Sequence, residues 1–321
     1  MSRPAGLLEH AGQAVGWTPL VEIQRLGKGL PGRVAVKLEY FSPGASIKDR
    51  PALAIVEAAE RAGVLRKGQR IVEKTSGNMG AGLAWACAIK GYRFTAVLSV
   101  GNTPERSQMI KAFGAEVVKV RQAPGAKPGQ VSKEDLDLVE AETQKLVKKY
   151  KAFRPDQFNN PGSVRAHRFG TGPEIWEQTA GRVTHFCSFA GSSGTLIGTA
   201  QALKERHAGV RVFAVEPAQA PFLAGKPVRD TRHAIQGGGY AVEPGIYDRG
   251  VVDAYLTVTD VEATRTARAL AASEGIMGGF STGANVAAAL QLARKAPRGS
   301  LIVTVACDSG LKYLSTDLYE A

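Results

Sequence analysis

Ser42-Pro43-Gly44-Ala45-Ser46-Ile47-Lys48-Asp49-Arg50 is the stretch around which the chain is organised. Its turn-forming residues exclude the interior of a helix or of a central strand. A helical pattern follows and ends at Gly63, and Pro51 fits the first turn of such a helix. Lys48 is therefore expected on the lip of a loop, near the positive end of a helix, where an ammonium group is disfavoured. A lysine that loses its proton easily can attack an aldehyde, although a solvated surface lysine is the commoner case.

Short apolar strands and helical segments alternate along the whole chain. The pattern predicts strands at 34–38, 70–73, 94–100, 116–120, 183–189, 210–215 and 301–306, and helices at 81–90, 103–113, 134–150, 172–179, 195–207, 261–273 and 283–295. Such alternation predicts an α/β protein with parallel sheets and right-handed crossovers, in two α/β units. We expect the crossover between the units near Pro155 and Asn159 to Gly162.

Composition narrows the possible partners of the chain. The 321 residues, 44% of them hydrophobic, suit two domains or one large α/β unit. The net charge of +12 is dispersed, and its densest run, Lys145 to Lys151, falls on an expected amphipathic helix. We therefore expect a solvated helix face and no nucleic-acid partner, whereas anionic small ligands would gain from this field. The Pro-, Gly- and Lys-rich segment from Arg121 to Lys133 is expected to be an exposed loop.

Cysteine usage and the N-terminus indicate a cytoplasmic protein with no membrane partner. Cys87, Cys187 and Cys307 have no metal-type spacing, and each is expected to be a small core residue with a reduced thiol. No segment is apolar enough to span a bilayer. The first twenty residues lack the charged head and apolar core of a signal peptide.

Three polar turns open helices directly after strands or loops. Gly191-Ser192-Ser193-Gly194-Thr195 offers close backbone approach, hydroxyl donors and free helix-start N–H groups, enough to surround a phosphate. The turn from Thr75 to Gly80, which contains Asn78, could cradle a carboxylate, and Ser281 opens a third helix. Each could also be an ordinary turn or N-cap. Together with Lys48, they form the set that a pyridoxal phosphate enzyme requires.

Eight segments carry a family resemblance from Gly16 to Thr316. They are KLEYFSPGASIKDR, IVEKTSGNMG, QFNNPGSVRAH, TGPEIWEQT, GSSGT, VEP, GFSTGA and DSGLKYLST. In this order they resemble the cysteine synthase / cystathionine β-synthase family of pyridoxal phosphate enzymes. The resemblance implies the two-domain fold type II (tryptophan synthase β-like) and a homodimer that binds pyridoxal 5'-phosphate. It also implies a smaller mobile domain of residues 48–154 and a larger domain of residues 1–47 with 155–321.

The resemblance also assigns roles to individual residues. Lys48 would hold the cofactor covalently and move the substrate α-proton, and Gly191, Ser192, Ser193, Gly194 and Thr195 would bind its phosphate. Asn78 would donate to the ring 3'-oxygen, and Ser281 would face the ring nitrogen. The substrate carboxylate would be bound by Thr75, Ser76, Met79 and Gln157. Metal ligands are not implied.

The implied reaction is β-replacement on an O-activated L-serine, O-acetylserine or O-phosphoserine. It would pass through an α-aminoacrylate, which accepts a nucleophile such as sulfide or a thiol. Departures from the family concentrate around the substrate: Met79 stands where Thr is usual, Ser42 where Asn is, Lys74 where Pro is and Cys307 where Pro is. GSSGT replaces the commoner GTGGT, and the glycine turn before Tyr240 is closer to cystathionine β-synthases.

Several other functions stay open from the sequence. A cystathionine β-synthase-like enzyme or a specialised β-replacement enzyme with another nucleophile would share all the motifs above. A serine/threonine dehydratase is disfavoured by Ile47 and by the serines of GSSGT, and a non-catalytic relative is disfavoured by the retained Lys48, Asn78 and Ser281. An NAD dehydrogenase is excluded because the GxGxxG fingerprint is absent.

Overall fold

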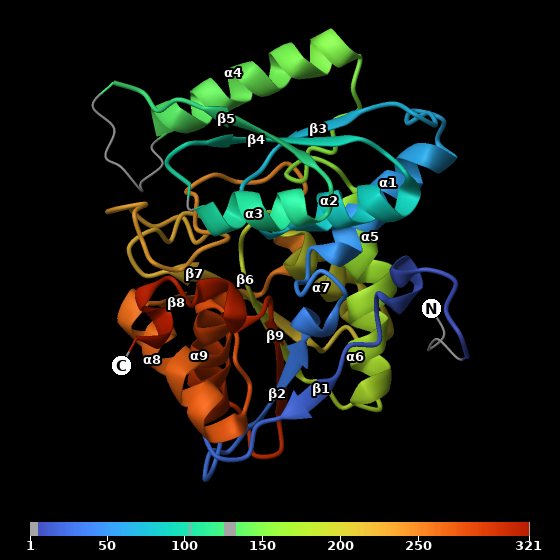
Figure 1. The fold of residues 1–321 in the computed structure, drawn as a ribbon. Helices are drawn as coiled ribbons and strands as arrows, with labels where there is room; N and C mark the ends of the chain where they lie inside the picture. The colour runs from blue at the N-terminus through green and yellow to red at the C-terminus, as the bar shows by residue number, and fades with distance from the viewer. Residues whose placement is uncertain (1–5, 103, 125–132, 321) are drawn as a thin grey trace.

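Two open sheets define the architecture of the computed structural model, which describes residues 6–102, 104–124 and 133–320 (Figure 1). The six-stranded sheet has the order β1-β2-β9-β6-β7-β8, and the three-stranded sheet has the order β3-β4-β5. All neighbouring strands are parallel except β1 and β2. The strands are β1 Leu20–Glu22, β2 Arg33–Leu38, β3 Ile71–Lys74, β4 Phe94–Ser99, β5 Glu116–Val120, β6 His185–Phe189, β7 Arg211–Pro217, β8 Ala254–Val258 and β9 Leu301–Ala306. The predicted α/β class with parallel-rich sheets is confirmed.

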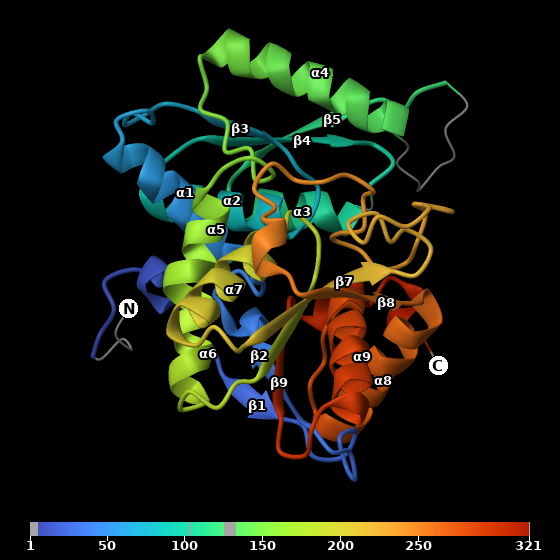
Figure 2. The ribbon, with the colours of Figure 1, turned by 180° about the vertical axis from the view of Figure 1, so that it is seen from behind.

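The larger sheet is covered by helices on both faces. Since alternate residues of a strand point to opposite sides, each strand contributes side chains to two apolar cores. Val34 and Val36 of β2 belong to the core formed with α8 (Asp260–Glu274) and α9 (Phe280–Lys295). Ala35 belongs to the core on the opposite face, with α6 (Gly172–Gln178) and α7 (Gly194–Arg206). Figure 2 shows the two helix layers on either side of the sheet.

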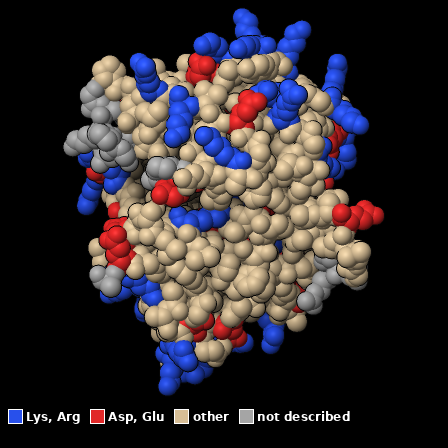
Figure 3. Space-filling view, viewed as in Figure 1, with Lys and Arg blue, Asp and Glu red and all other residues tan. Residues whose placement is uncertain are grey.

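The smaller sheet is covered in the same way. Ile71 and Phe94 pack with α1 (Asp49–Arg61), α2 (Asn78–Lys90) and α3 (Pro104–Ala112). Val72 and Val97 pack under α4 (Lys133–Tyr150), which lies across the far face at the top of Figure 1. The lysines late in α4 are exposed, as expected, and basic side chains are spread over the molecular surface in Figure 3.

Two helices begin earlier than predicted, and this matters for the site. The sequence predicted starts at residues 81 and 283, but α2 starts at Asn78 and α9 at Phe280. In both cases an extended glycine, Gly77 or Gly279, is the N-cap, so the polar turn residues after it already belong to the helix. Asn78 and Ser281 therefore project from first helical turns.

Other elements were not predicted at all. They are the short strands β1 and β8, the helix α5 (Gly162–Ala166) and the π-helical turn His167–Thr171 that follows it. Most of the predicted exposed loop, residues 125–132, and the predicted N-cap Thr103 lie outside the described residues. Helix α1 packs against both α2 and α5, so it joins the two sheet units.

Candidate functional site

The Lys48 loop is clamped between the end of β9 and helix α2. The Ile47 N–H donates to the Cys307 carbonyl at 2.7 Å, and Ser46 forms a bridge with Asp308. On the other side, a Cβ on Gly82 would lie 2.9 Å from the Lys48 carbonyl oxygen, so α2 packs directly on this backbone. Lys48 is the N-cap residue of α1 and is half-buried. The predicted loop lysine at a helix N-terminus is therefore present, at the carboxyl edge of the larger sheet.

Burial lowers the pKa of Lys48 below its ordinary value, and the neighbouring Cys307 and Asp308 only partly oppose this. The helix dipole was the cause expected from the sequence, but loss of solvation is the largest cause of the lowered Lys48 pKa. A lysine in this setting gives up its proton more readily than a surface lysine, and its neutral amine is the nucleophilic form.

The turn between β6 and α7, residues Gly191 to Thr195, is closely packed against neighbouring segments; we call it the phosphate cup. A Cβ on Gly191 would collide with the Gly237 carbonyl oxygen, and one on Gly194 would lie 2.9 Å from Ser163. Ser193 adopts a left-handed φ of 66°, and its buried hydroxyl has no hydrogen-bond partner among the described residues. The first N–H groups of α7 have no acceptor within the helix. Free donors at a helix N-terminus suit an anion such as a phosphate.

His167 is a buried residue that is hydrogen-bonded to Thr195 of the phosphate cup. Its ring contacts Thr195 Oγ1 at 3.2 Å through Nε2 and Thr171 Oγ1 at 2.8 Å through Nδ1. Burial and the positive charges of Arg50 and Lys48 hold the pKa of His167 well below its ordinary value. His167 is therefore a neutral hydrogen-bonding group at physiological pH.

The turn between β3 and α2, residues Thr75 to Gly80, is tied to other parts of the chain by its side chains; we call it the substrate turn. Asn78 donates to Asp308 Oδ2 at 2.6 Å and accepts from Lys312 Nζ at 2.9 Å. Ser76 Oγ accepts from Arg106 at 3.3 Å, and Arg106 also donates to Gln236. Because Gln236, Asp308 and Lys312 lie outside the smaller sheet unit, these contacts cross between the units.

Two predicted substrate residues of this region differ in placement. Met79 is only 2% exposed, and its side chain belongs to the apolar core of the smaller sheet unit. Gln157 is half-buried, and its carbonyl accepts from the hydroxyl of Ser163, the residue that packs against Gly194. Gln157 is thus linked to the edge of the phosphate cup, while Met79 faces away from the polar groups of the turn.

Ser281 is buried in the first turn of α9. It is hydrogen-bonded to the thiol of Cys307, and burial raises the pKa of that thiol to about 12. The thiols of Cys87, Cys187 and Cys307 are free, and Cys87 and Cys187 are buried core residues as predicted. Cys307 follows the last residue of β9 and is only half-buried: it packs at the edge of the core, and its carbonyl binds the residue before Lys48.

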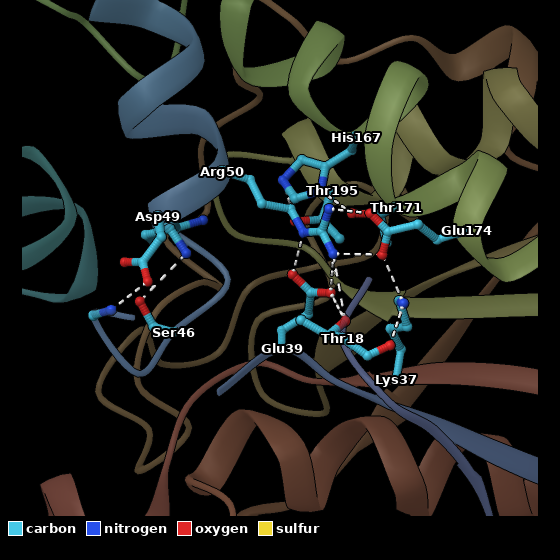
Figure 4. A network of polar contacts seen from close by, with 12 residues as sticks. Thr18, Lys37, Glu39, Ser46, Asp49, Arg50, His167, Thr171, Glu174 and Thr195 are labelled. Carbon is cyan, nitrogen blue, oxygen red and sulfur yellow. Dashed lines mark hydrogen bonds and ion pairs between the residues drawn. The ribbon is translucent and has the colours of Figure 1, made fainter. Parts of the chain in front are cut away.

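A buried network of ion pairs anchors the residues that follow Lys48 (Figure 4). Arg50 bonds to Glu39 at 2.6 Å and to Glu174 at 2.6 Å, and Glu174 also pairs with Lys37 at 2.7 Å. All four side chains are at most 3% exposed. Burial alone would raise the pKa of Glu174, but Arg50 and Lys37 outweigh it and lower that pKa to about 2. The network joins β2, α1 and α6, and its two positive side chains balance its two negative ones. It begins two residues after Lys48, at Arg50.

The structure gathers the main candidates at one place. Lys48, Asn78 and Ser281 are connected through Cys307 and Asp308, and the phosphate cup is linked to them through His167. Four features of the site were not predicted from the sequence: the Arg50 network, Arg106, Asp308 and Lys312. Arg50 and the DSGLKYLST segment were visible as motif residues, but their partners lie far away in sequence. Among the described residues, no group of three or more His, Cys, Asp or Glu side chains could hold a metal ion.

A lysine of lowered pKa, an anion cup and polar helix starts together define an α/β enzyme that uses an aldehyde-bearing phosphate cofactor. Residues 11–308 match the family described as pyridoxal-phosphate dependent enzyme. The chain is 41% identical to cysteine synthase 3 of Caenorhabditis elegans over 98% of this chain and 90% of that protein. It is also 41% identical to O-ureido-L-serine synthase of Streptomyces lavendulae, over 95% and 91%.

The structural comparison agrees with the sequence relatives. The crystal structure of O-acetyl serine sulfhydrylase isoform 3 from Entamoeba histolytica superposes with a TM-score of 0.91 at 37% identity, covering 100% of this chain and 94% of that one. The chain belongs to the pyridoxal-phosphate-dependent enzyme family. The predictions of a pyridoxal phosphate cofactor and of a cysteine synthase-type enzyme that carries out β-replacement on an O-activated serine are confirmed. No helix in the described part of the chain has the length and hydropathy needed to cross a membrane.

Proposed function

We propose that this enzyme uses O-acetyl-L-serine or O-phospho-L-serine as donor and sulfide as nucleophile, and so forms L-cysteine. The observation that carries the proposal is the position of Lys48, a half-buried lysine of lowered pKa. Its neighbours Asp308 and Cys307 bind Asn78 and Ser281, and its charge acts on His167, which binds Thr195 of the phosphate cup. A thiol in place of sulfide is the second candidate, because the sequence of the glycine turn at Gly237 to Gly239 is closer to cystathionine β-synthases. This turn packs directly against Gly191 of the phosphate cup.

The residues present fit pyridoxal phosphate. The unpartnered hydroxyl of Ser193 and the free N–H groups at the start of α7 are donors without acceptors, as a phosphate site requires. Asn78 has two N–H bonds, and only one is used by Asp308, so the other can serve the cofactor ring. Ser281 offers a neutral hydroxyl to the ring nitrogen. Lys48 would hold the aldehyde carbon.

Lys48 also performs the central proton transfer in this proposal. When bound, pyridoxal phosphate supplies an electron sink for the electron pair left by removal of the substrate α-proton. Lys48 takes that proton with its neutral amine, which is more available than in a surface lysine because burial lowers the pKa of this group. The clamp of β9 and α2 on its backbone keeps the amine at a fixed place during the transfer.

The substrate turn would bind the α-carboxylate of the donor. Thr75 and Ser76 offer hydroxyls and the start of α2 offers N–H groups, while Gln157 approaches from the phosphate cup. Met79 would contribute only its backbone N–H, because its side chain is in the core. Arg106 is half-buried beside Ser76 and has no carboxylate partner among the described residues, so it would balance the charge of the bound carboxylate.

The arrangement of the whole protein follows from the family and is part of the proposal. Residues 48–154 would move as the smaller domain against residues 1–47 with 155–321, and the enzyme would act as a cytoplasmic homodimer. The separate sheets support the division, and the contacts of Arg106 and Lys312 would be the ones that change when the domains move. Light scattering of the purified protein would measure the oligomeric state.

The decisive experiment follows the visible absorption of the purified holoenzyme during titration with O-acetylserine, O-phosphoserine, L-serine and L-cysteine. We expect one activated serine to change the spectrum and sulfide to restore it with formation of cysteine. A spectrum that ignores both activated serines would reject the proposed donors while leaving the cofactor in place. Restoration by homocysteine but not by sulfide would favour the thiol alternative.

Lys48→Ala tests the role of the lysine directly. We expect turnover to fall by roughly 10³-fold or more, since both the covalent anchor and the proton carrier are lost. The visible band of the bound cofactor should disappear on dialysis, while circular dichroism should show an intact fold. A variant that keeps the normal turnover would exclude this role for Lys48.

A further inference from the structure

Lys312 and Asp308 bind the two ends of the Asn78 amide, and Tyr313 binds Asp308 behind it. Lys312 lies in the short 3-10 helix Gly310–Tyr313, which follows β9. Its Nζ donates to Asn78 Oδ1 at 2.9 Å and to the Gly44 carbonyl of the Lys48 loop at 3.1 Å. Asp308 Oδ2 accepts from Asn78 Nδ2 at 2.6 Å and from the Tyr313 hydroxyl at 2.7 Å. Lys312 thus touches both turns that contribute to the cofactor site.

These contacts determine which end of the Asn78 amide is a donor. A side-chain amide has one acceptor end and one donor end, and either end could face a ligand. An ammonium group at Oδ1 and a carboxylate at Nδ2 allow only one orientation. One Nδ2–H then binds Asp308, and the second Nδ2–H has no partner among the described residues.

The charge of Lys312 also acts on that remaining N–H. A cation bound to the oxygen end of an amide draws electrons from the nitrogen and strengthens its hydrogen bonds. The effect is larger here because Lys312 is half-buried and little screened by water. Burial lowers the pKa of Lys312, and the neighbouring carboxyl groups of Asp308 and Asp49 oppose this. Burial also raises the pKa of Asp49 to about 7, and Lys48 is a further basic neighbour of Asp308.

We propose that Lys312 is a positioning residue that holds Asn78 as a polarised donor toward the phenolic oxygen of pyridoxal phosphate and favours the ionised form of that oxygen. The inference rests on the proposed role of Asn78 in cofactor binding. Lys312 does not touch the substrate, so its effect belongs to the cofactor and should be visible before any substrate is added.

The test uses Lys312→Met, Lys312→Gln and Lys312→Arg, with Lys295→Met as control, because Lys295 is an exposed lysine at the end of α9. Each protein is loaded with pyridoxal phosphate, and its visible spectrum is recorded from pH 6 to pH 10 in the absence of substrate. In Lys312→Met and Lys312→Gln we expect more of the form in which the phenolic oxygen of the cofactor is not ionised, which absorbs at shorter wavelength. The apparent pKa of that oxygen should rise by about one unit. We expect the cofactor to dissociate several-fold more readily, while Lys312→Arg and Lys295→Met should resemble the wild type.

A double-mutant cycle shows whether Lys312 acts through Asn78. In an Asn78→Ala background, the change Lys312→Met should add almost nothing to the spectral shift, because its target is gone. Equal shifts in both backgrounds would overturn the inference, as would a wild-type spectrum in every folded neutral variant. Circular dichroism identifies the folded variants. Lys312→Gln is included because glutamine keeps a hydrogen-bond donor, so this variant serves if Lys312→Met does not fold. A wild-type protein without any cofactor band would overturn the proposed function, and this inference with it.

Discussion

The phosphate cup and the substrate turn have the same topology but are built in opposite ways. Both connect the carboxyl end of a parallel strand to the start of a helix, β6 to α7 and β3 to α2. In the phosphate cup, neighbouring backbone at Gly237 and Ser163 leaves no room for side chains on Gly191 and Gly194. In the substrate turn, a Cβ on Gly77 would meet nothing within 4 Å, and the turn is tied to other segments by the side chains of Asn78 and Ser76.

In the proposed site, this difference separates two requirements, binding of the cofactor phosphate and binding of the donor amino acid. A phosphate is the same in every enzyme of the class, so a rigid backbone surface can bind it with few side-chain interactions. A donor amino acid varies, and side chains that reach across to the other sheet unit can adjust without a change of backbone. Two departures of this sequence from its family, Lys74 and Met79, fall next to or within the substrate turn, whereas the serines of GSSGT fall in the phosphate cup.

The largest contrast should come from adding one methyl group to each turn. Gly191→Ala would press a Cβ against the Gly237 carbonyl, and overpacking of this kind costs about 1–3 kcal/mol. We expect the dissociation constant of pyridoxal phosphate to rise roughly 10- to 100-fold. Gly77→Ala adds no contact within 4 Å at a negative φ of −113° and should bind the cofactor normally. Fluorescence titration of the apoproteins measures both constants, and equal constants would erase the distinction between the turns.

Met79→Thr probes whether the substrate turn depends on the core beneath it. The sequence comparison alone predicts a change of donor preference, whereas the burial of Met79 predicts a loss of stability of about 2 kcal/mol. Met79→Leu keeps the volume and should lose less than about 1.5 kcal/mol. Urea unfolding gives the stabilities, and kcat/KM for both activated serines gives the preference. We expect the preference to stay constant; a reversed preference would mean that the side chain shapes the substrate site.

The sequence was sufficient for the parts of the protein that depend on local patterns. Alternating apolar segments located seven of the strands, and the Lys48 loop, the phosphate cup and Asn78 were recognisable because each combines turn formers with a following helix. β1 and β8 were missed because they are short and largely only half-buried, so their apolar pattern is weak.

The missed site residues have a different cause. Glu174 lies 124 positions after Arg50, and Lys312 lies 234 positions after Asn78, so no local pattern connects them. The burial of Met79 was hidden for the same reason, since a single Met near a polar turn gives no indication of its direction. Long-range ion pairs form only when the sheets bring their strands together, and a single sequence does not show which partners meet.

Arg106 provides a milder test of the substrate turn. Its guanidinium joins Ser76 to Gln236 across the two units, and hydrogen bonds to charged groups contribute about 1.5–3 kcal/mol. We expect Arg106→Gln to raise KM for the donor by roughly 10-fold with a smaller change in kcat. Arg106→Lys should fall between, because it keeps the charge but loses the planar fork. Arg66→Gln, at an exposed loop arginine, is the control. Unchanged KM values would place Arg106 outside substrate binding.

The smallest effect is expected from the titration of His167, which is hydrogen-bonded to Thr195 of the phosphate cup. His167 is neutral in the folded protein because its pKa is held well below the ordinary value, so the unfolded chain binds more protons at acidic pH. The stability that depends on this group is therefore complete above about pH 6.5 and is lost as the pH falls below it, by roughly 1 kcal/mol at pH 6. His167→Gln keeps a hydrogen-bonding side chain beside Thr195 but cannot titrate. Urea unfolding at pH 6 and pH 8 should show a smaller difference for this variant than for the wild type, and identical differences would mean that other groups carry the acid sensitivity of the phosphate cup.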